Sequence, residues 1–273
     1  MDISGRAIVL TNDVIVELQL QDIDVELDMC NYSKLAYRSG DEVSSIHGHT
    51  AFISKKDAQC HIWSYHNMLV VAFRGTESGG DIATDIKIVR VNMDICRVEG
   101  KSCPKVHMGF MNQFEEVIDD VSRYVDEFTN NPINAGKQIY FTGHSLGGGL
   151  ATIAALYFTY KVSNPIACIT FGSPRVGSSV FVHTFMERVR KSIRYVNQED
   201  PVPFMPSGIM YNHVGGIRYI DRNGKINNHI TENRLCNFMI DCVCCCRKDR
   251  PIHDHNCADY YNAIMTYKHS ARN

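Results

Sequence analysis

The segment Gln138-Ile-Tyr-Phe-Thr-Gly-His-Ser-Leu-Gly147 runs from an apolar β-type stretch into a glycine-rich one, and an apolar helical stretch follows to about Tyr160. Its G-x-S-x-G sequence places a serine between a predicted strand and a predicted helix. So tight a turn leaves room only for glycines beside the serine backbone, and it points the helix N-terminus at the Ser145 hydroxyl. The pattern predicts a nucleophilic serine, with the N–H of Leu146 donating to an oxyanion. A glycine-rich turn without chemistry is the alternative, because short matches occur by chance.

Patterns of strands and helices surround this turn. Residues 13–20 alternate between apolar and polar side chains, and the segment after them, ending at Tyr37, has helical spacing. The further predicted elements are strands at 61–65 and 68–73 joined by a hairpin turn at His66-Asn67, a helix over 110–128, a strand at 166–171, a helix near 180–189, a strand at 193–196 and a late hairpin around 217–224. The alternation from residue 69 to 196 predicts a mainly parallel sheet covered by helices on both faces.

Composition limits the class of protein. The chain has 273 residues, of which 44% are hydrophobic and 21% charged, so it is long and apolar enough for one domain with a sizeable core. Its 28 basic and 30 acidic residues argue against a nucleic-acid partner. The longest apolar stretch, 150–160, is too short to span a bilayer, and the N-terminus does not resemble a signal peptide. An odd count of 11 cysteines favours free thiols in a reducing compartment, and we expect a cytoplasmic protein.

A serine is a weak nucleophile until a base, oriented by an acid, takes its proton. In hydrolases with a G-x-S-x-G turn, the acid and then the histidine follow the serine along the chain. Asp200 comes just beyond a predicted strand in a loop that two prolines stiffen, and His253 and His255 precede a helical stretch. Taken singly, a turn-capping carboxylate and solvated surface histidines are the alternatives. The order and the local context together favour a catalytic role and leave both histidines as candidates.

Several motifs, spread over roughly residues 25 to 266, resemble those of the class 3 lipase family of α/β-hydrolases. The serine turn has this family's form, and the other similar segments are Val71-Ala-Phe-Arg-Gly-Thr76, Val106-His-Met-Gly-Phe110, Phe171-Gly-Ser-Pro-Arg-Val-Gly177, the N-x-x-D-x-V-P loop at 197–203 and the D-H-x-x-x-x-Y segment at 254–260. The last two favour Asp200 over Glu199 as the acid and His255 over His253 as the base.

The resemblance implies a single α/β-hydrolase domain over residues 1–273 and a serine carboxylester hydrolase of the triacylglycerol lipase type, acting on acyl lipids. The implied site consists of a catalytic triad and two oxyanion donors: Ser145, Asp200 and His255, with Thr76 and Leu146. No metal ion or organic cofactor is expected. A phospholipase A1 or a mono- or diacylglycerol lipase is the alternative among enzymes. An inactive lipase-like binding or signalling module is the alternative from another class.

Two segments depart from the family pattern. In fungal members an apolar lid follows the oxyanion residue, ahead of an acidic residue that Asp85 matches here. In this chain residues 77–82 contain two glycines and one large apolar side chain, Ile82, so we expect only a modest rise in rate at a lipid surface.

The second departure is a predicted insert near 236–250 that carries Cys242, Cys244, Cys245 and Cys246. Three interpretations stay open for it. The insert is reduced and inert, or palmitoylated and in peripheral contact with a membrane or lipid droplet, or it is a metal site completed by Cys236 or His253. The sequence does not determine the oligomeric state.

Overall fold

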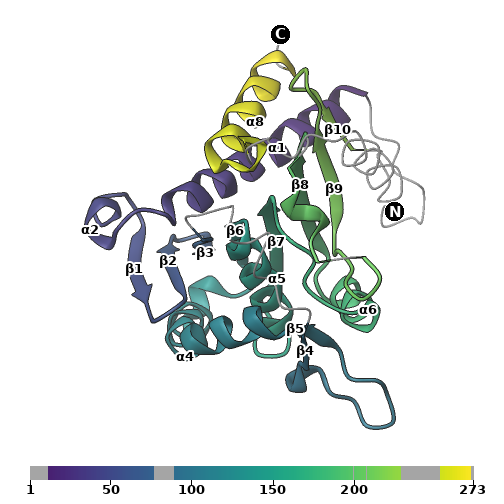
Figure 1. Cartoon of the computed structure of the whole chain (residues 1–273). Helices are drawn as coiled ribbons and strands as arrows, with labels where there is room; N and C mark the ends of the chain where they lie inside the picture. Colours follow the sequence, from purple (N-terminus) through teal and green to yellow (C-terminus); the bar gives the residue numbers. More distant parts are fainter. Residues whose placement is uncertain (1–11, 77–88, 199, 207, 229–252, 272–273) are drawn as a thin grey trace, which may run out of the picture.

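An eight-stranded sheet forms the centre of the structure, and its strands in chain order are β1 (His49–Ser54), β2 (Gln59–Ser64), β3 (Met68–Phe73), β6 (Gln138–His144), β7 (Ile166–Phe171), β8 (Lys191–Asn197), β9 (Gly216–Ile220) and β10 (Ile226–Asn227) (Figure 1). They lie side by side in this same order. The computed structural model describes residues 12–76, 89–198, 200–206, 208–228 and 253–271.

The middle of the sheet is parallel, as the sequence predicted. Strands β3, β6, β7, β8 and β9 pair in parallel, whereas β1 and β2 at one edge and β10 at the other pair antiparallel. The predicted hairpin turn at residues 66–67 is confirmed, and the late hairpin is β9–β10. Because parallel strands end at the same edge, β3, β6, β7 and β8 deliver the segments after Phe73, His144, Phe171 and Asn197 to one edge of the sheet.

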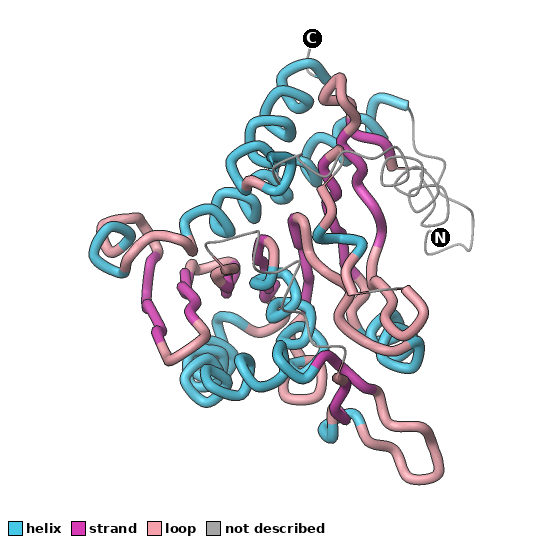
Figure 2. Tube along the Cα trace, in the orientation of Figure 1, coloured by secondary structure: helices cyan, strands magenta, loops and turns pink. Residues whose placement is uncertain are grey.

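Helices cover both faces of the sheet (Figure 1, Figure 2). The helices α1 (Asn12–Leu35) and α8 (Cys257–Ala271) pack together on one face, and α4 (Met108–Asn130), α5 (Leu146–Phe158) and α6 (Ser179–Arg188) share the core of the other. The short elements are α2 (Gly40–Val43), η1 (Asp94–Cys96), η2 (Pro132–Asn134), η3 (Val202–Phe204) and η4 (His253–His255).

Strand β3 shows why the predicted strands are apolar almost throughout. Leu69, Val71 and Phe73 belong to the core beneath α4 and α5, and Val70 and Ala72 belong to the core beneath α1. Successive side chains of a strand point to opposite faces, so a strand covered on both faces buries all of them. This two-sided burial separates the central strands from the half-exposed β1 at the edge.

The first helix differs from the sequence pattern. The sequence showed two separate patterns: an alternation of apolar and polar side chains over residues 13–20, and a helical segment that ends at Tyr37. Both lie largely within the continuous helix α1. No glycine or proline occurs between Asn12 and Leu35 to end the helix. Continuation of the helix therefore outweighs a short local alternation.

Two pieces of structure had no signal in the sequence patterns. One is the edge strand β1, which pairs with β2. The other is an antiparallel pair formed by β4 (Arg90–Asn92) and β5 (Lys105–His107), whose connecting loop projects from the body (Figure 1). Strands of three residues are too short to show a periodicity.

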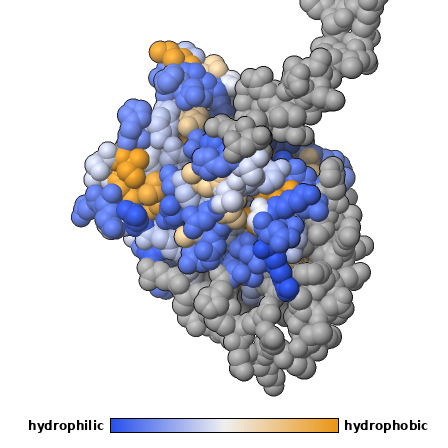
Figure 3. Space-filling model, turned by 90° about the horizontal axis from the view of Figure 1, so that it is seen from above, coloured by the Kyte–Doolittle hydropathy of each residue, from blue (hydrophilic) through white to orange (hydrophobic). Residues whose placement is uncertain are grey.

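None of the described helices is long and apolar enough to cross a bilayer. On the face seen in Figure 3, hydrophobic residues form small patches separated by hydrophilic ones.

Two histidines are paired inside the β1–β2 edge. His49 Nε2 and His61 Nδ1 are 3.0 Å apart, and His61 Nε2 is 3.1 Å from the carbonyl oxygen of Arg38. The His61 ring stacks on Phe52 and Trp63. Burial lowers the pKa of His61 to about 4, because the charged ring would lose its hydration there.

The glycines of the serine turn are needed for close packing. A Cβ on Gly147 would lie 2.2 Å from the carbonyl oxygen of Phe73, and one on Gly143 would lie 2.4 Å from the backbone of Gly147. Backbone atoms cannot move aside as the end of a flexible side chain can. These contacts fix α5 against the ends of β3 and β6.

We therefore predict that Gly147→Ala lowers the free energy of unfolding by about 1–3 kcal/mol, the usual cost of overpacking. Gly216→Ala is the matched control, because its added Cβ would meet nothing closer than 3.8 Å. Urea unfolding followed by circular dichroism measures both variants. Equal stability of the two would contradict the packing argument.

We also predict a pH dependence of stability from His61. Below about pH 6.5 the unfolded chain binds a proton that the folded chain excludes until about pH 4, so the free energy of unfolding falls as pH decreases through this range. His61→Gln should reduce the slope by the share that belongs to one proton, because other buried histidines such as His144 also have lowered pKa values. His66→Gln, at an exposed turn, should keep the full slope. Thermal unfolding measured at several pH values tests this. A slope that is unchanged in His61→Gln would assign the effect to other groups.

Candidate active site

Ser145 lies in the turn between β6 and α5 with φ 59° and ψ −133°. Non-glycine residues rarely adopt such a conformation, which costs about 1–3 kcal/mol and persists where the surroundings enforce it. The enforcing contacts include the hydrogen bond from Ser145 N–H to the carbonyl oxygen of Phe171, at 2.9 Å. The Ser145 hydroxyl is buried, and it has no hydrogen-bond partner among the described residues.

The loop after β3 passes directly over this serine. A Cβ on Gly75 would lie 2.6 Å from the carbonyl oxygen of His144 and 3.1 Å from Cβ of Ser145. Only glycine permits so close an approach, and the next residue along the loop is Thr76. Leu146 is the first residue of α5, where backbone N–H groups have no partner within the helix. Leu146 thus follows Ser145 in the chain, and Thr76 follows the glycine that approaches Ser145.

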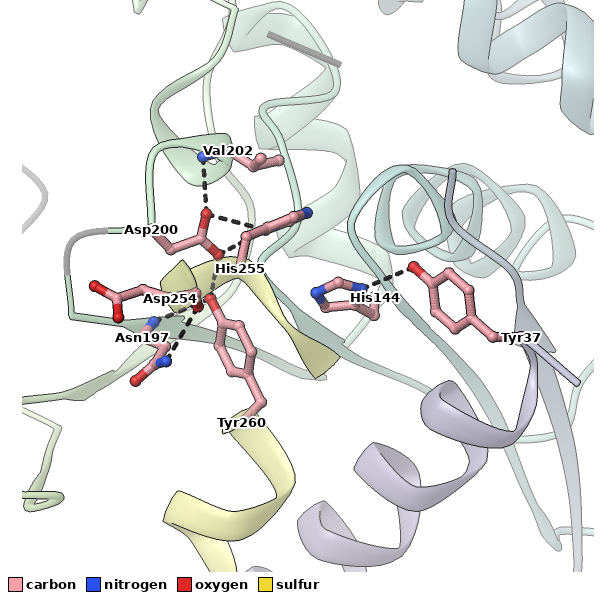
Figure 4. Close-up of polar contacts among 8 residues, drawn as sticks. All are labelled: Tyr37, His144, Asn197, Asp200, Val202, Asp254, His255 and Tyr260. Carbon is pink, nitrogen blue, oxygen red and sulfur yellow. Dashed lines mark hydrogen bonds and ion pairs between the residues drawn. The ribbon is translucent and has the colours of Figure 1, made fainter. Parts of the chain in front are cut away.

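Asp200 and His255 form a buried pair (Figure 4). His255 Nδ1 is 2.8 Å from Oδ2 of Asp200 and 3.0 Å from its Oδ1. The N–H of Val202 donates to Oδ1 of Asp200 at 2.9 Å. The other ring nitrogen, Nε2 of His255, is buried without a hydrogen-bond partner among the described residues. A carboxylate at Nδ1 leaves Nε2 as the nitrogen that can accept a proton.

The end of β7 brings the pair to the serine. Phe171 accepts the backbone hydrogen bond of Ser145, and the next residue, Gly172, has φ 57°. A Cβ on Gly172 would lie 2.7 Å from Oδ2 of Asp200 and 3.1 Å from the His255 ring. Phe171 therefore contacts Ser145, and the next residue, Gly172, packs against Asp200 and His255.

Tyr260 extends the hydrogen bonding behind the acid. Its hydroxyl donates to Oδ2 of Asp200 at 2.5 Å and accepts from the N–H of Asn197 at 3.0 Å. Asn197 Nδ2 in turn donates to the carbonyl oxygen of Asp254, at 3.1 Å. These three hydrogen bonds join the acid loop to the histidine segment and fix Asp200 relative to His255. The sequence motif included Tyr260 and Asn197 but gave neither of them a role.

His144 separates the pair from α1. Its ring centroid is 4.5 Å from that of His255, and its Nδ1 is 2.8 Å from the hydroxyl of Tyr37. Burial, and then the nearby His255, hold the pKa of His144 well below its usual value. A neutral His144 does not repel a positive charge on His255. The sequence carried no signal for Tyr37, and His144 was only the variable residue of the serine motif.

The predicted residues Ser145, Asp200, His255, Thr76 and Leu146 all fall at the same end of the parallel strands. The lid at 77–82 with Asp85, the rejected acid Glu199 and the cysteines at 242–246 lie outside the described residues. Within the described part of the chain, no group of three or more His, Cys, Asp or Glu side chains could hold a metal ion.

The family model for lipase (class 3) matches residues 70–210, which include Ser145 and Asp200 but not His255. The chain is 30% identical over 180 residues to a secreted mono- and diacylglycerol lipase of Fusarium solani, a match that covers 64% of this chain and 51% of that protein. It is 26% identical over 159 residues to a chloroplastic phospholipase A1 of Arabidopsis thaliana, with 53% and 35% covered. The chain thus spans about half of the first relative and about a third of the second.

Among solved structures, lipase II from Rhizopus niveus aligns with a TM-score of 0.68 at 21% identity. The alignment covers 88% of this chain and 93% of that one. At this identity the likeness is one of fold.

We predict that Tyr260→Phe lowers the free energy of unfolding by about 1–3 kcal/mol, because it removes a donor to a buried carboxylate and leaves the N–H of Asn197 unpaired. Tyr261→Phe is the matched control, because the Tyr261 ring keeps its contact with Lys34. Chemical denaturation of both variants measures the difference. A Tyr260→Phe variant as stable as Tyr261→Phe would show that the hydroxyl does not support the acid loop.

Proposed function

Because this chain belongs to the class 3 lipase family and has the α/β-hydrolase fold predicted for it, we propose that it is a serine carboxylester hydrolase acting on acyl glycerolipids. One observation carries the proposal: the buried Asp200–His255 pair stands beside a serine in strained backbone conformation at a helix N-terminus. The two curated relatives are named for mono- and diacylglycerols and for phospholipids. Their shared chemistry is an acyl ester of glycerol, which is the substrate class proposed here.

In the first step, Oγ of Ser145 attacks the acyl carbonyl carbon while Nε2 of His255 takes the hydroxyl proton. The negative charge that develops on the carbonyl oxygen is stabilised by the N–H groups of Leu146 and Thr76. Asp200 accepts from Nδ1 of His255, so it holds the ring in position and stabilises its positive charge. The neutral His144 beside the ring allows this charge to form.

Two steps follow: the alcohol leaves, and water then repeats the attack that Ser145 made. Protonated His255 gives its proton to the leaving alcohol as the carbon–oxygen bond breaks, and an acyl group remains on Ser145. Water then loses a proton to His255 and attacks the acyl carbonyl. The fatty acid leaves, Ser145 regains its proton, and each oxyanion is held by the same two N–H groups.

We predict that Ser145→Ala and His255→Ala each reduce hydrolysis of a short-chain soluble ester by a factor on the order of a million, with no further loss when they are combined, because the two residues act as a unit. His253→Ala is the matched control, two residues away in the same turn, and should keep most activity. Initial rates are measured for the unsubstituted chain and the four variants, and a fluorophosphonate probe with peptide mapping should label Ser145 in the unsubstituted chain.

An intact chain that neither hydrolyses the ester nor takes up the probe would favour the inactive binding module. Greater loss in His253→Ala than in His255→Ala would show that the base is assigned to the wrong histidine.

A further inference from the structure

Exposed apolar side chains are concentrated on two segments that contact each other. Large hydrophobic residues that are well exposed number six among the described residues, and four of them lie in these segments. Val89 and Val98 belong to the segment 89–106, here called the β4–β5 arm, and Ile209 and Met210 precede β9. Ile209 is 92% exposed.

Polar contacts tie the two segments together. The Arg90 guanidinium donates to the carbonyl oxygen of Met210 at 3.0 Å and lies over the ring of Tyr211. The Tyr211 hydroxyl donates to the carbonyl oxygen of Val89 at 3.1 Å. The apolar side chains of Val89 and Met210 are therefore held on one surface and do not belong to two independent loops.

This surface lies at the active-site end of the sheet. Ile209 lies in the connection between β8 and β9, which also contains Asp200. This connection is bound to the segment after β7 by the hydrogen bond from Arg175 N–H to the carbonyl oxygen of Met205, at 2.7 Å. Gly177 bridges Val106 of the arm and Asn212 of the connection. The arm and the connection are thus built around the ends of the strands that supply the site.

The arm is also more basic than the chain as a whole. Residues 89–106 contain four basic side chains and two acidic ones, whereas the whole chain has 28 basic and 30 acidic. The loop between β4 and β5 projects from the body (Figure 1). Within it, the turn from Val98 to Lys101 brings an apolar and a cationic residue together and is closed by a hydrogen bond from Lys101 N–H to Val98 O. Lys101 and Lys105 are exposed and have no carboxylate partner among the described residues.

We propose that the β4–β5 arm together with Ile209 and Met210 is a docking surface for lipid aggregates with anionic headgroups. The proposal rests on the proposed function, because it assigns the surface from which the same site takes its substrate. Exposed apolar side chains enter the headgroup region, and cations are attracted by the negative surface potential. Docking on this side turns the active-site end of the sheet, with Ser145, toward the lipid.

An exposed isoleucine outside this surface, Ile133, provides a matched control for Ile209. Ile133, 74% exposed, lies in η2 just before β6, so it is at the opposite end of the strand that leads to Ser145. The substitutions Ile209→Asp and Ile133→Asp make the same chemical change at the two ends of the strands. Lys101→Glu combined with Lys105→Glu tests the charges.

Binding is measured by co-sedimentation with vesicles of phosphatidylcholine alone or mixed with phosphatidylglycerol. All proteins carry Ser145→Ala, so that no lipid is consumed, and circular dichroism verifies their folding. We expect stronger binding to the anionic vesicles, weakened by salt. Ile209→Asp should lose roughly tenfold in partition, because an inserted apolar side chain is replaced by a charge that the vesicle repels. The double lysine variant should lose at least that much, and Ile133→Asp should bind as the parent does.

Absence of binding to either vesicle, equal losses in Ile209→Asp and Ile133→Asp, or binding that ignores the anionic lipid would each overturn the proposal. Self-association lost in Ile209→Asp, measured by sedimentation without vesicles, would assign the surface to a second copy of the chain instead. Hydrolysis of the soluble ester by the unsubstituted chain reports on the proposed function separately, so the failure of one proposal is distinguishable from the failure of the other.

Discussion

Close approach of backbone to backbone at the end of β6 is the constraint on which the site depends. Gly143 and Gly147 allow α5 to begin against the ends of β3 and β6, and Gly75 lets the neighbouring loop pass over the serine. Each contact would be blocked by a single Cβ. Together they hold Ser145 in a conformation that an isolated turn would leave, and they place the N-terminus of α5 directly after the serine.

The acid and the histidine depend on a different kind of contact. Asp200 accepts hydrogen bonds from Val202 in its own loop and from His255 and Tyr260 in the segment 254–260. Several donors hold the carboxylate in one orientation, and the carboxylate in turn orients the imidazole of His255. Packing therefore shapes the serine side of the site, whereas hydrogen bonding shapes the histidine side, and Gly172 lies where the two meet.

Local patterns predicted the parts of the fold that local physics decides. The parallel strands were visible because two-sided burial makes them apolar throughout, and the serine turn was visible because its sterics demand glycine. Strand β1 and the β4–β5 pair were not visible, because their residues are held by partners distant in sequence. At the site, motif order led to Asp200 and to two candidate histidines, the family resemblance favoured His255, and the structure pairs His255 with Asp200. Tyr37 could not be found, since its contact with His144 spans 107 residues and follows no spacing rule.

The packing of α8 against α1 has a consequence for synthesis on the ribosome. Ser145 and Asp200 belong to segments made before α8, whereas His255 is placed by the turn that opens this helix. The helix finds its partner in α1, with Lys268 paired to Asp24 at 2.7 Å. A nascent chain can thus assemble its sheet and its serine turn while the histidine is still missing. Under the proposed mechanism, the growing polypeptide has no hydrolytic power toward the membranes around it until α1, made before the sheet, receives α8, made after it.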